Sequence, residues 1–201
     1  MASILQQTSF RLSAYQVSDL PLDSGFEVCF MGRSNVGKSS LINALCERRQ
    51  LARVSKTPGR TQCLNVFDIQ SHARLVDCPG YGFAKVDKGM RSHWRTLMQK
   101  YLQKRKSLVR IYWMMDARHP LQPADQEMLS LLSDYYGKVV IVLSKLDALN
   151  KDQQKRIVLT VASEFKKAHT VPRVLGVSSL KKIGMDILIQ DMSDALVLRA
   201  E

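Results

Sequence analysis

Residues 27–46 read EVCFMGRSNVGKSSLINALC, an apolar run followed by a loop with two glycines and then a helical pattern. From Gly32 to Ser39 the loop matches GxxxxGK[ST], which forms a phosphate-binding loop when a strand precedes it and a helix follows. Backbone N–H groups of such a loop surround phosphate oxygens, and the helix N-terminus adds the positive end of its dipole. Lys38 would reach the β- and γ-phosphates, and the Ser39 hydroxyl would hold Mg²⁺. We therefore predict a nucleotide site made of Gly32, Arg33, Ser34, Asn35, Val36, Gly37, Lys38, Ser39 and Ser40.

Short runs rich in β-branched and aromatic residues recur on both sides of this loop and predict strands at 26–31, 63–69, 74–77, 109–116, 138–144 and 173–177. Helical patterns lie between them, at 38–46, 90–106, 124–136, 152–168 and 185–198. Such alternation implies parallel strands joined by right-handed crossovers. We predict a three-layer α/β fold with a mostly parallel six-stranded sheet and about five flanking helices, with ligands at the carboxyl ends of the strands. Residues 1–22 are expected to be an N-terminal extension packed on a single domain of residues 23–201.

The composition is that of a soluble globular chain, with 201 residues of which 45% are hydrophobic and 24% charged. Disordered, collagen-like and coiled-coil classes are excluded. No apolar run approaches the roughly 20 residues that span a bilayer, and the first residues lack the pattern of a secretory signal. The four cysteines form no close pair. We expect a cytoplasmic protein with no membrane span, with reduced thiols, and monomeric in isolation.

The net charge of +12 is unevenly distributed, because residues 33–118 alone carry a net charge of +13. A basic segment between nearly neutral ones favours a positive face that meets phosphate, either on nucleic acid or on an anionic membrane surface. The alternative is a solvated surface that serves only solubility.

A phosphate loop alone does not separate GTPases from kinases and ATPases, so the base-reading element matters. Ser144-Lys145-Leu146-Asp147 follows a strand and resembles [NT]KxD, with Ser144 departing from the usual first residue. The Asp147 carboxylate can accept hydrogen bonds from N1–H and the exocyclic amine of guanine, a donor pair that adenine lacks, and the Lys145 stem can cover the base. After the last strand, Val177, Ser178 and Ser179 resemble the short loop whose backbone amide contacts the guanine oxygen.

Two further elements complete the predicted site. Asp77-Cys78-Pro79-Gly80 is a DxxG in which Asp77 can hold Mg²⁺ through water and the Gly80 N–H can contact the γ-phosphate. Upstream, the polar loop with Pro58, Gly59, Arg60 and Thr61 offers a threonine to the metal; Thr61 is preferred over Thr57 because it directly precedes a strand. We predict catalytic roles for Lys38, Thr61 and Gly80, and metal ligation by Ser39, Thr61 and Asp77.

Four segments, GRSNVGKSSLINAL, SKTPGRTQ, LVDCPGYGFAKV and MDARHPLQPAD, resemble the EngB family of bacterial ribosome-assembly GTPases, with a likeness that extends over about residues 10–198. The resemblance implies a Ras-like P-loop GTPase domain, Mg²⁺-dependent hydrolysis of GTP to GDP, and a switch role in large-subunit assembly with contact to its rRNA. Ras-like enzymes often place a water-orienting glutamine where this chain has Tyr81, so a slow intrinsic turnover is expected.

Some alternatives stay open at this point. Asn35 resembles the asparagine of potassium-dependent bacterial GTPases, which coordinates K⁺ beside the phosphates; it could instead stabilise the loop through its own backbone. The chain could also be a nucleotide-gated RNA-binding protein with negligible intrinsic GTPase activity, a vestigial pocket on an RNA-binding module, or a P-loop kinase or ATPase.

Overall fold

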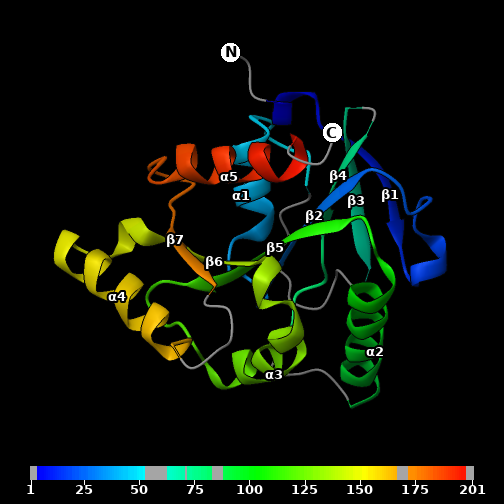
Figure 1. The fold of residues 1–201 in the computed structure, drawn as a ribbon. Coiled ribbons are helices and arrows are strands. Elements are labelled where there is room, and N and C mark those ends of the chain that lie inside the picture. Colours follow the sequence, from blue (N-terminus) through cyan, green and yellow to red (C-terminus); the bar gives the residue numbers. More distant parts are fainter. Residues whose placement is uncertain (1–3, 53–62, 71, 83–87, 167–171, 198–201) are drawn as a thin grey trace.

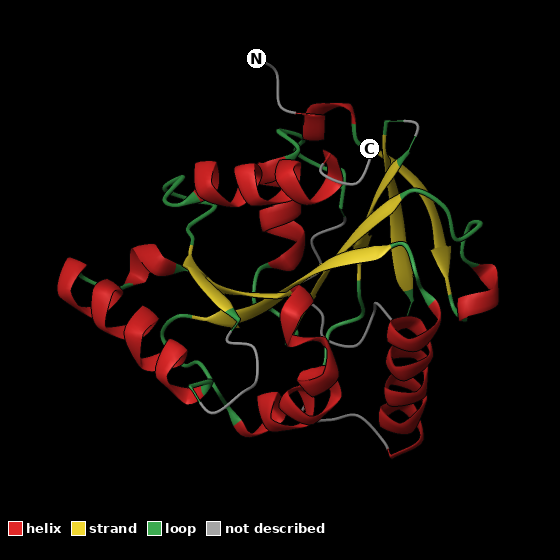
Figure 2. Cartoon of the chain, viewed as in Figure 1, coloured by secondary structure: helices red, strands yellow, loops and turns green. Residues whose placement is uncertain are grey.

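The computed structural model describes residues 4–52, 63–70, 72–82, 88–166 and 172–197 (Figure 1). Strands and helices alternate along most of the chain, as the sequence predicts, and Figure 2 shows one twisted sheet with helices on both sides. The strands are β1 (Ser9–Ala14), β2 (Phe26–Gly32), β3 (Leu64–Ile69), β4 (Ala73–Asp77), β5 (Leu108–Asp116), β6 (Val139–Ser144) and β7 (Arg173–Gly176). The α-helices are α1 (Lys38–Leu45), α2 (Lys88–Lys104), α3 (Pro123–Leu132), α4 (Lys151–Glu164) and α5 (Met185–Val197), with 3-10 turns at Ile4–Gln7, Val17–Asp19, Ser133–Lys138 and Leu146–Ala148.

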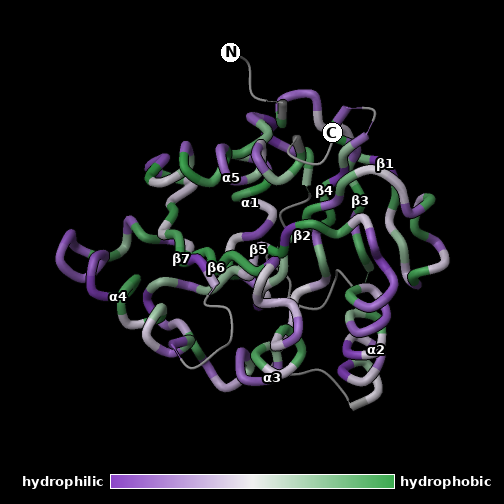
Figure 3. The backbone as a smooth tube through the Cα atoms, in the orientation of Figure 1, coloured by the Kyte–Doolittle hydropathy of each residue, from purple (hydrophilic) through white to green (hydrophobic). Residues whose placement is uncertain are grey.

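The sheet has the strand order β1-β3-β4-β2-β5-β6-β7. From β4 to β7 all neighbours are parallel, whereas β3 is antiparallel to both β4 and β1. Helices cover both faces of the parallel part, which is why β6 is buried at every position and apolar at all but the last, Ser144. Figure 3 shows hydrophobic residues along β5 and β6.

Two hydrophobic clusters lie on the two sides of the sheet. Alternate residues of β2 supply both: Val28 and Phe30 join the cluster with α1 and α5, while Cys29 and Met31 join the cluster with α2, α3 and α4. In Figure 1 these two groups of helices lie on opposite sides of the strands. The predicted three-layer, mostly parallel α/β architecture is therefore confirmed.

The predicted number of six strands is corrected to seven, because β1 adds an antiparallel edge strand beside β3. Five of its six residues are exposed or only half-buried, with Ala14 alone fully buried. The sequence SFRLSA does alternate polar and apolar residues, with Phe10, Leu12 and Ala14 at every second position, and the strand prediction overlooked this short period-2 signal. The predicted helix 124–136 is also shorter, since α3 ends at Leu132 and a 3-10 turn follows.

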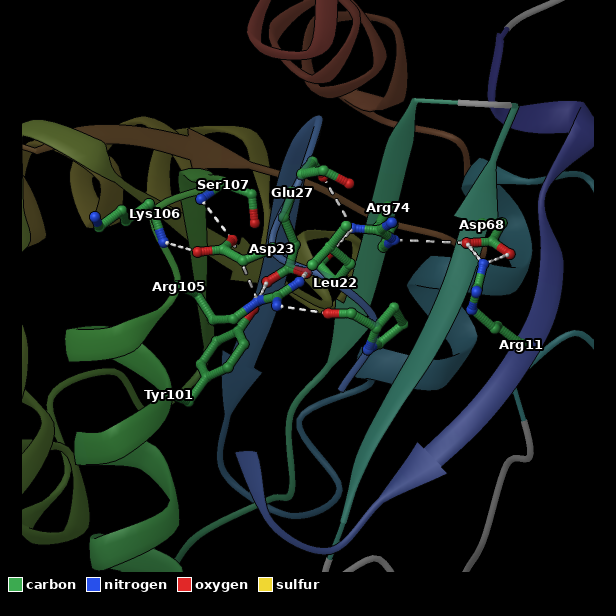
Figure 4. A network of polar contacts seen from close by, with 12 residues as sticks. Arg11, Leu22, Asp23, Glu27, Asp68, Arg74, Tyr101, Arg105, Lys106 and Ser107 are labelled. Atoms are coloured by element: carbon green, nitrogen blue, oxygen red, sulfur yellow. Dashed lines mark hydrogen bonds and ion pairs between the residues drawn. The ribbon is translucent and has the colours of Figure 1, made fainter. Parts of the chain in front are cut away.

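A buried polar network joins α2 to the sheet at the amino-terminal end of β2 (Figure 4). Glu27 is fully buried and accepts hydrogen bonds from the Tyr101 hydroxyl (2.8 Å) and from Arg105 Nε (3.3 Å) and Nη2 (2.7 Å). Asp23 accepts from the backbone N–H groups of Lys106 and Ser107. The C-terminal end of α2 is thereby attached to the start of β2 and β5. None of the helices in the described ranges is long and apolar enough to cross a membrane.

Candidate functional site

The predicted site segments follow the carboxyl ends of neighbouring parallel strands. The phosphate loop follows β2, the DxxG begins at the last residue of β4, the base-reading tetrapeptide begins at the last residue of β6, and residues 177–179 follow β7. Backbone hydrogen bonds join these segments: Cys78 N–H donates to the Phe30 carbonyl (3.0 Å), and Leu146 N–H donates to the Val177 carbonyl (3.0 Å). Parallel pairing therefore brings segments far apart in sequence to one edge of the sheet.

The phosphate loop has the backbone that its glycines and asparagine permit. Asn35 and Gly37 adopt positive φ angles of 61° and 102°, a region that glycine enters freely and that asparagine tolerates better than most residues. A Cβ at Gly32 would lie 2.8 Å from the Met114 carbonyl oxygen, so a larger residue would push the loop away from β5. Gly37 precedes the first residue of α1, Lys38, and the helix N-terminus therefore opens directly onto the loop.

Asp77 fits a divalent cation. The residue is 5% exposed, and its Oδ1 atom is buried with no hydrogen-bond partner. Burial raises the pKa of this carboxyl, against the opposing influence of the nearby Lys38 ammonium and of a hydrogen bond from Ser39. An orphaned carboxylate oxygen beside a serine hydroxyl is the hard-oxygen donor set that Mg²⁺ accepts together with phosphate and water. The remaining predicted ligand, Thr61, and its neighbours Pro58, Gly59 and Arg60 lie outside the described residues.

The DxxG backbone lies against the phosphate loop. A Cβ added at Gly80 would be 3.1 Å from both the backbone N and the Cα of Ser34, and 3.5 Å from Lys38 Nζ. Glycine is therefore the residue that allows this approach. Cys78 is a buried free thiol whose pKa is raised by burial and by the adjacent Cys29, and the Pro79 carbonyl accepts a hydrogen bond from Trp94 Nε1 (3.0 Å).

Tyr81 points into the protein interior. Its side chain is in the core cluster beside α2 and α3, its ring lies 5.5 Å from that of Trp94, and its hydroxyl donates to Asp125 Oδ1 (2.7 Å) while accepting from Trp113 Nε1 (2.7 Å). Burial and the nearby Asp125 carboxylate raise the pKa of the phenol well above its ordinary value. A neutral, fully bonded phenol in the core has no free group with which to orient an attacking water.

The base-reading tetrapeptide is attached to the phosphate loop. Ser144 Oγ lies 2.7 Å from the Val36 carbonyl oxygen and 3.1 Å from that of Met115, so the hydroxyl that departs from the usual motif still bonds to the loop. Lys145 Nζ donates to the Asn35 carbonyl (2.9 Å) and to Asp116 Oδ2 (3.0 Å). The turn is completed by Lys145 in a left-handed conformation, with φ at 57°.

The residues beyond the tetrapeptide hold its aspartate and leucine. Ser178 Oγ donates to Asp147 Oδ1 (2.5 Å) and accepts from Lys181 N–H (3.0 Å). Leu146 is buried against Gly176, where an added Cβ would approach the leucine side chain to 2.8 Å. Ser179 follows directly on the surface side of this turn, half-buried.

Two acidic residues of the segment MDARHPLQPAD, Asp116 and Asp125, were not predicted as site residues. Asp116 accepts from Lys145 and from the Arg118 guanidinium (2.9 and 2.7 Å); burial alone would raise its pKa, but these hydrogen bonds hold it well below the usual range. Asp125 is fully buried beside Tyr81. The available signal was the high content of charged and proline residues in this segment. Lys145, which bonds to Asp116, and Tyr81, which bonds to Asp125, are both far away in the sequence.

The side chain of Arg33, a residue predicted to belong to the nucleotide site, is bonded to a segment outside the phosphate loop. Its Nη2 donates to the His119 carbonyl (3.0 Å), and its Nε lies 3.7 Å from Asp125 Oδ2. The guanidinium is thus directed toward the start of α3, which leaves the backbone of Arg33 as its contribution to a phosphate site.

Comparisons with known proteins agree with this arrangement. Residues 27–145 match the family described as 50S ribosome-binding GTPase. The probable GTP-binding protein EngB of Tolumonas auensis is 44% identical over 193 residues, covering 94% of this chain and 89% of the relative, and that of Shigella flexneri is 43% identical over 187 residues, covering 93% and 89%.

Solved structures show the same fold. The crystal structure of a probable GTP-binding protein engB matches with a TM-score of 0.65 at 19% identity, over 86% of this chain and 100% of that one. Era in complex with MgGDPNP and nucleotides 1506–1542 of 16S ribosomal RNA matches with a TM-score of 0.66 at 23% identity, over 86% of this chain and 57% of that one.

Proposed function

This chain belongs to the EngB family of GTP-binding proteins, and from that premise we propose that it hydrolyses GTP with Mg²⁺ and acts as a nucleotide-dependent switch in assembly of the large ribosomal subunit. The observation that carries the proposal is the convergence of Lys38, Ser39, Asp77 and Gly80 at one end of the sheet, with the base-reading turn bonded to the same loop. The site of action would be the bacterial cytoplasm, with the isolated protein a monomer.

The residues divide the work on the nucleotide. The phosphate-loop N–H groups and Lys38 would hold the phosphates, and the Gly80 N–H would contact the γ-phosphate that hydrolysis removes. Ser39 and Asp77, with Thr61, would hold Mg²⁺, which when bound neutralises charge that develops on the phosphates. Asp147 would read the guanine edge, and Lys145 would cover the base from its fixed position between Asn35 and Asp116.

Two binding measurements test the nucleotide assignment. Fluorescent GTP should bind with Mg²⁺ and be displaced by GDP but not by ATP, and phosphate release should accompany its turnover. Preference for ATP would indicate a kinase or ATPase, and absence of binding to either nucleotide would indicate a vestigial pocket.

The second candidate is a nucleotide-gated RNA-binding protein with negligible intrinsic GTPase activity. The buried phenol of Tyr81 favours it, since the position after the DxxG offers no group to the attacking water. Single-turnover hydrolysis with and without large ribosomal subunits separates the two: release of phosphate in neither condition would favour the binding protein.

The proposed RNA contact rests on the basic face of α2. This helix contains Lys88, Arg91, Arg95, Lys100 and Lys104 and no acidic residue. Its apolar stripe, which includes Leu97 and Tyr101, is buried, and Arg95, Lys100 and Lys104 are exposed on the outer side. Arg91 forms an ion pair with Glu127 of α3. Closely spaced cations on a helix that has no acidic residue of its own suit a phosphate backbone, whose binding they would strengthen without reading sequence.

A charge-reversal pair tests this surface. Arg95→Glu with Lys100→Glu should weaken cosedimentation with large subunits and lower its dependence on salt, because fewer counterions are released. Lys151→Glu with Lys155→Glu on α4 is the matched control, since these residues are equally exposed at the other end of the same helical layer (Figure 1). Equal losses in both variants would indicate general electrostatic attraction and contradict a contact through α2.

A further inference from the structure

The segment MDARHPLQPAD ends at Asp125, a carboxylate that the nucleotide chemistry proposed above does not use. Asp125 lies in the first turn of α3 and is 0% exposed. Its Oδ2 accepts a hydrogen bond from the backbone N–H of Gln122 (2.8 Å), the N-cap residue of α3, and this contact caps the helix. The same oxygen lies 3.7 Å from Arg33 Nε. Its Oδ1 accepts from the Tyr81 hydroxyl (2.7 Å), a residue of a different segment altogether.

Tyr81 connects this carboxylate to the DxxG. The residue follows Gly80 directly, and its hydroxyl is held from two sides, by Asp125 and by Trp113 Nε1 at 2.7 Å. Its backbone is also fixed, because its carbonyl accepts from Ser34 N–H (2.9 Å) and its N–H donates to the Gly32 carbonyl (3.4 Å). Tyr81 is therefore joined to the core by its side chain and to the phosphate loop by its main chain.

These contacts set the position of the Gly80 peptide. On one side the Pro79 carbonyl is held by Trp94 Nε1 (3.0 Å), and on the other Tyr81 is fixed as described. Gly80 itself lies so close to Ser34 that a Cβ would come within 3.1 Å of its backbone N. Gly82, the second residue after it, packs against α3, where a Cβ would lie 3.0 Å from Ala124 Cβ. The first turn of α3 therefore contacts the two residues that directly follow Gly80, Tyr81 through Asp125 and Gly82 through Ala124.

We propose that Asp125 is a positioning residue for the γ-phosphate contact, holding the Gly80 N–H against the phosphate loop through the Tyr81 hydroxyl. The inference rests on the proposed function, in which Gly80 contacts the γ-phosphate. A Gly80 N–H that is already held in position binds the γ-phosphate without an entropic cost for ordering its peptide. Loss of the Asp125–Tyr81 hydrogen bond should therefore weaken the binding of GTP and leave that of GDP, which has no γ-phosphate, unaffected. A purely structural contact would instead alter folding stability and leave the ratio of the two affinities unchanged.

The experiment compares two nucleotides in the full chain with Mg²⁺. Dissociation constants for GDP and for a non-hydrolysable GTP analogue are measured in the wild type, Tyr81→Phe, Asp125→Asn and the control Tyr136→Phe. Tyr136 also donates its hydroxyl to an internal acceptor, the Leu129 carbonyl at 3.3 Å, but away from the DxxG. Tyr81→Phe removes one oxygen and keeps the ring, so it decides the outcome if Asp125→Asn does not fold.

Loss of one net hydrogen bond corresponds to about a fivefold change in a binding constant. We expect Tyr81→Phe and Asp125→Asn to weaken the GTP analogue by about this factor or more, with GDP affinity held within about twofold and the control unchanged. Parallel weakening of both nucleotides, or no change in either, would overturn the positioning role. Failure of the wild type to bind either guanine nucleotide would instead overturn the proposed function.

Discussion

The buried pair of Glu27 and Arg105 makes a quantitative prediction about stability. Replacing Arg105 with methionine removes three guanidinium hydrogen bonds, two to Glu27 and one from Nη1 to the Pro21 carbonyl (2.9 Å). It also removes the ion pair between Nε and Asp23 Oδ1 (3.8 Å). Glu27, with its side chain 0% exposed, would keep the Tyr101 hydroxyl alone as a donor. Breaking a buried ion pair on one side costs about 3–5 kcal/mol, because the remaining charge is left without compensation. We expect the free energy of unfolding to fall by that amount.

Urea-induced unfolding, followed by circular dichroism, measures this loss. Arg11→Met is the matched control, because Arg11 pairs with Asp68 at 3.0 Å with side chains 45% and 31% exposed, and such pairs contribute less than about 1 kcal/mol. The double variant Glu27→Gln with Arg105→Met should recover part of the loss, since no charge remains buried. A cost for Arg105→Met no larger than that of the control would contradict a penalty for the unpaired Glu27 carboxylate, as would a double variant less stable than the single one.

Three shorter predictions concern the nucleotide site. Lys38→Ala should lower GTP affinity at least about a hundredfold without loss of folding, because the charged hydrogen bonds of this half-buried side chain to phosphate are removed. A fluorescent-nucleotide titration with Lys151→Ala as control checks it. Asp147→Asn should shift preference from GTP toward XTP, since xanthine presents an acceptor where guanine has an amine; unchanged competition by XTP would place the base reader elsewhere. Asp77→Asn should abolish Mg²⁺-dependent binding yet stabilise the chain by about 1 kcal/mol at pH 7. The folded-state pKa of Asp77 is raised above its ordinary 3.8, so the ionised form opposes folding and stability falls as the pH rises through that pKa; the advantage of the asparagine variant should vanish at lower pH. A stability difference between Asp77→Asn and the wild type that does not change with pH would contradict a raised pKa as its cause.

Replacement of Na⁺ by K⁺ at constant ionic strength decides between the two roles left open for Asn35, coordination of K⁺ and stabilisation of the loop. Hydrolysis should rise in K⁺, and Asn35→Gly should keep the positive φ of 61° while removing the side-chain oxygen and with it the K⁺ response. Equal rates in the two salts would leave the left-handed backbone as the reason for an asparagine at this position.

The elements that the sequence predicts well are those with a strong local pattern. The phosphate loop between β2 and α1 has a fixed residue spacing, and α2 has a regular apolar stripe that the structure buries at Leu97, Met98, Tyr101 and Leu102. These features depend on residues within one or two turns, so local spacing suffices to find them.

Features that depend on distant partners could not be predicted in the same way. The pairing partner of β1 is one of them, because only the folded sheet brings Ser9 opposite Asp68 of β3. Arg33 is predicted to belong to the nucleotide site from its place in the loop, whereas the direction of its side chain depends on Asp125, buried at the start of a later helix. The roles of Asp116 and Asp125 likewise depend on Lys145 and Tyr81, which only the folded sheet brings near.

The pairing of β1 with β3 also has a consequence for the order in which the chain is made. Residues 9–14 leave the ribosome before residues 64–69 exist, and at roughly 5–20 residues per second the partner strand follows about 3–10 s later. During that interval β1 is an unpaired strand. The positive charge of Arg11, which later pairs with Asp68 of β3, disfavours pairing with other nascent chains. The arginine that pairs with β3 in the folded protein therefore also protects β1 before β3 has been made.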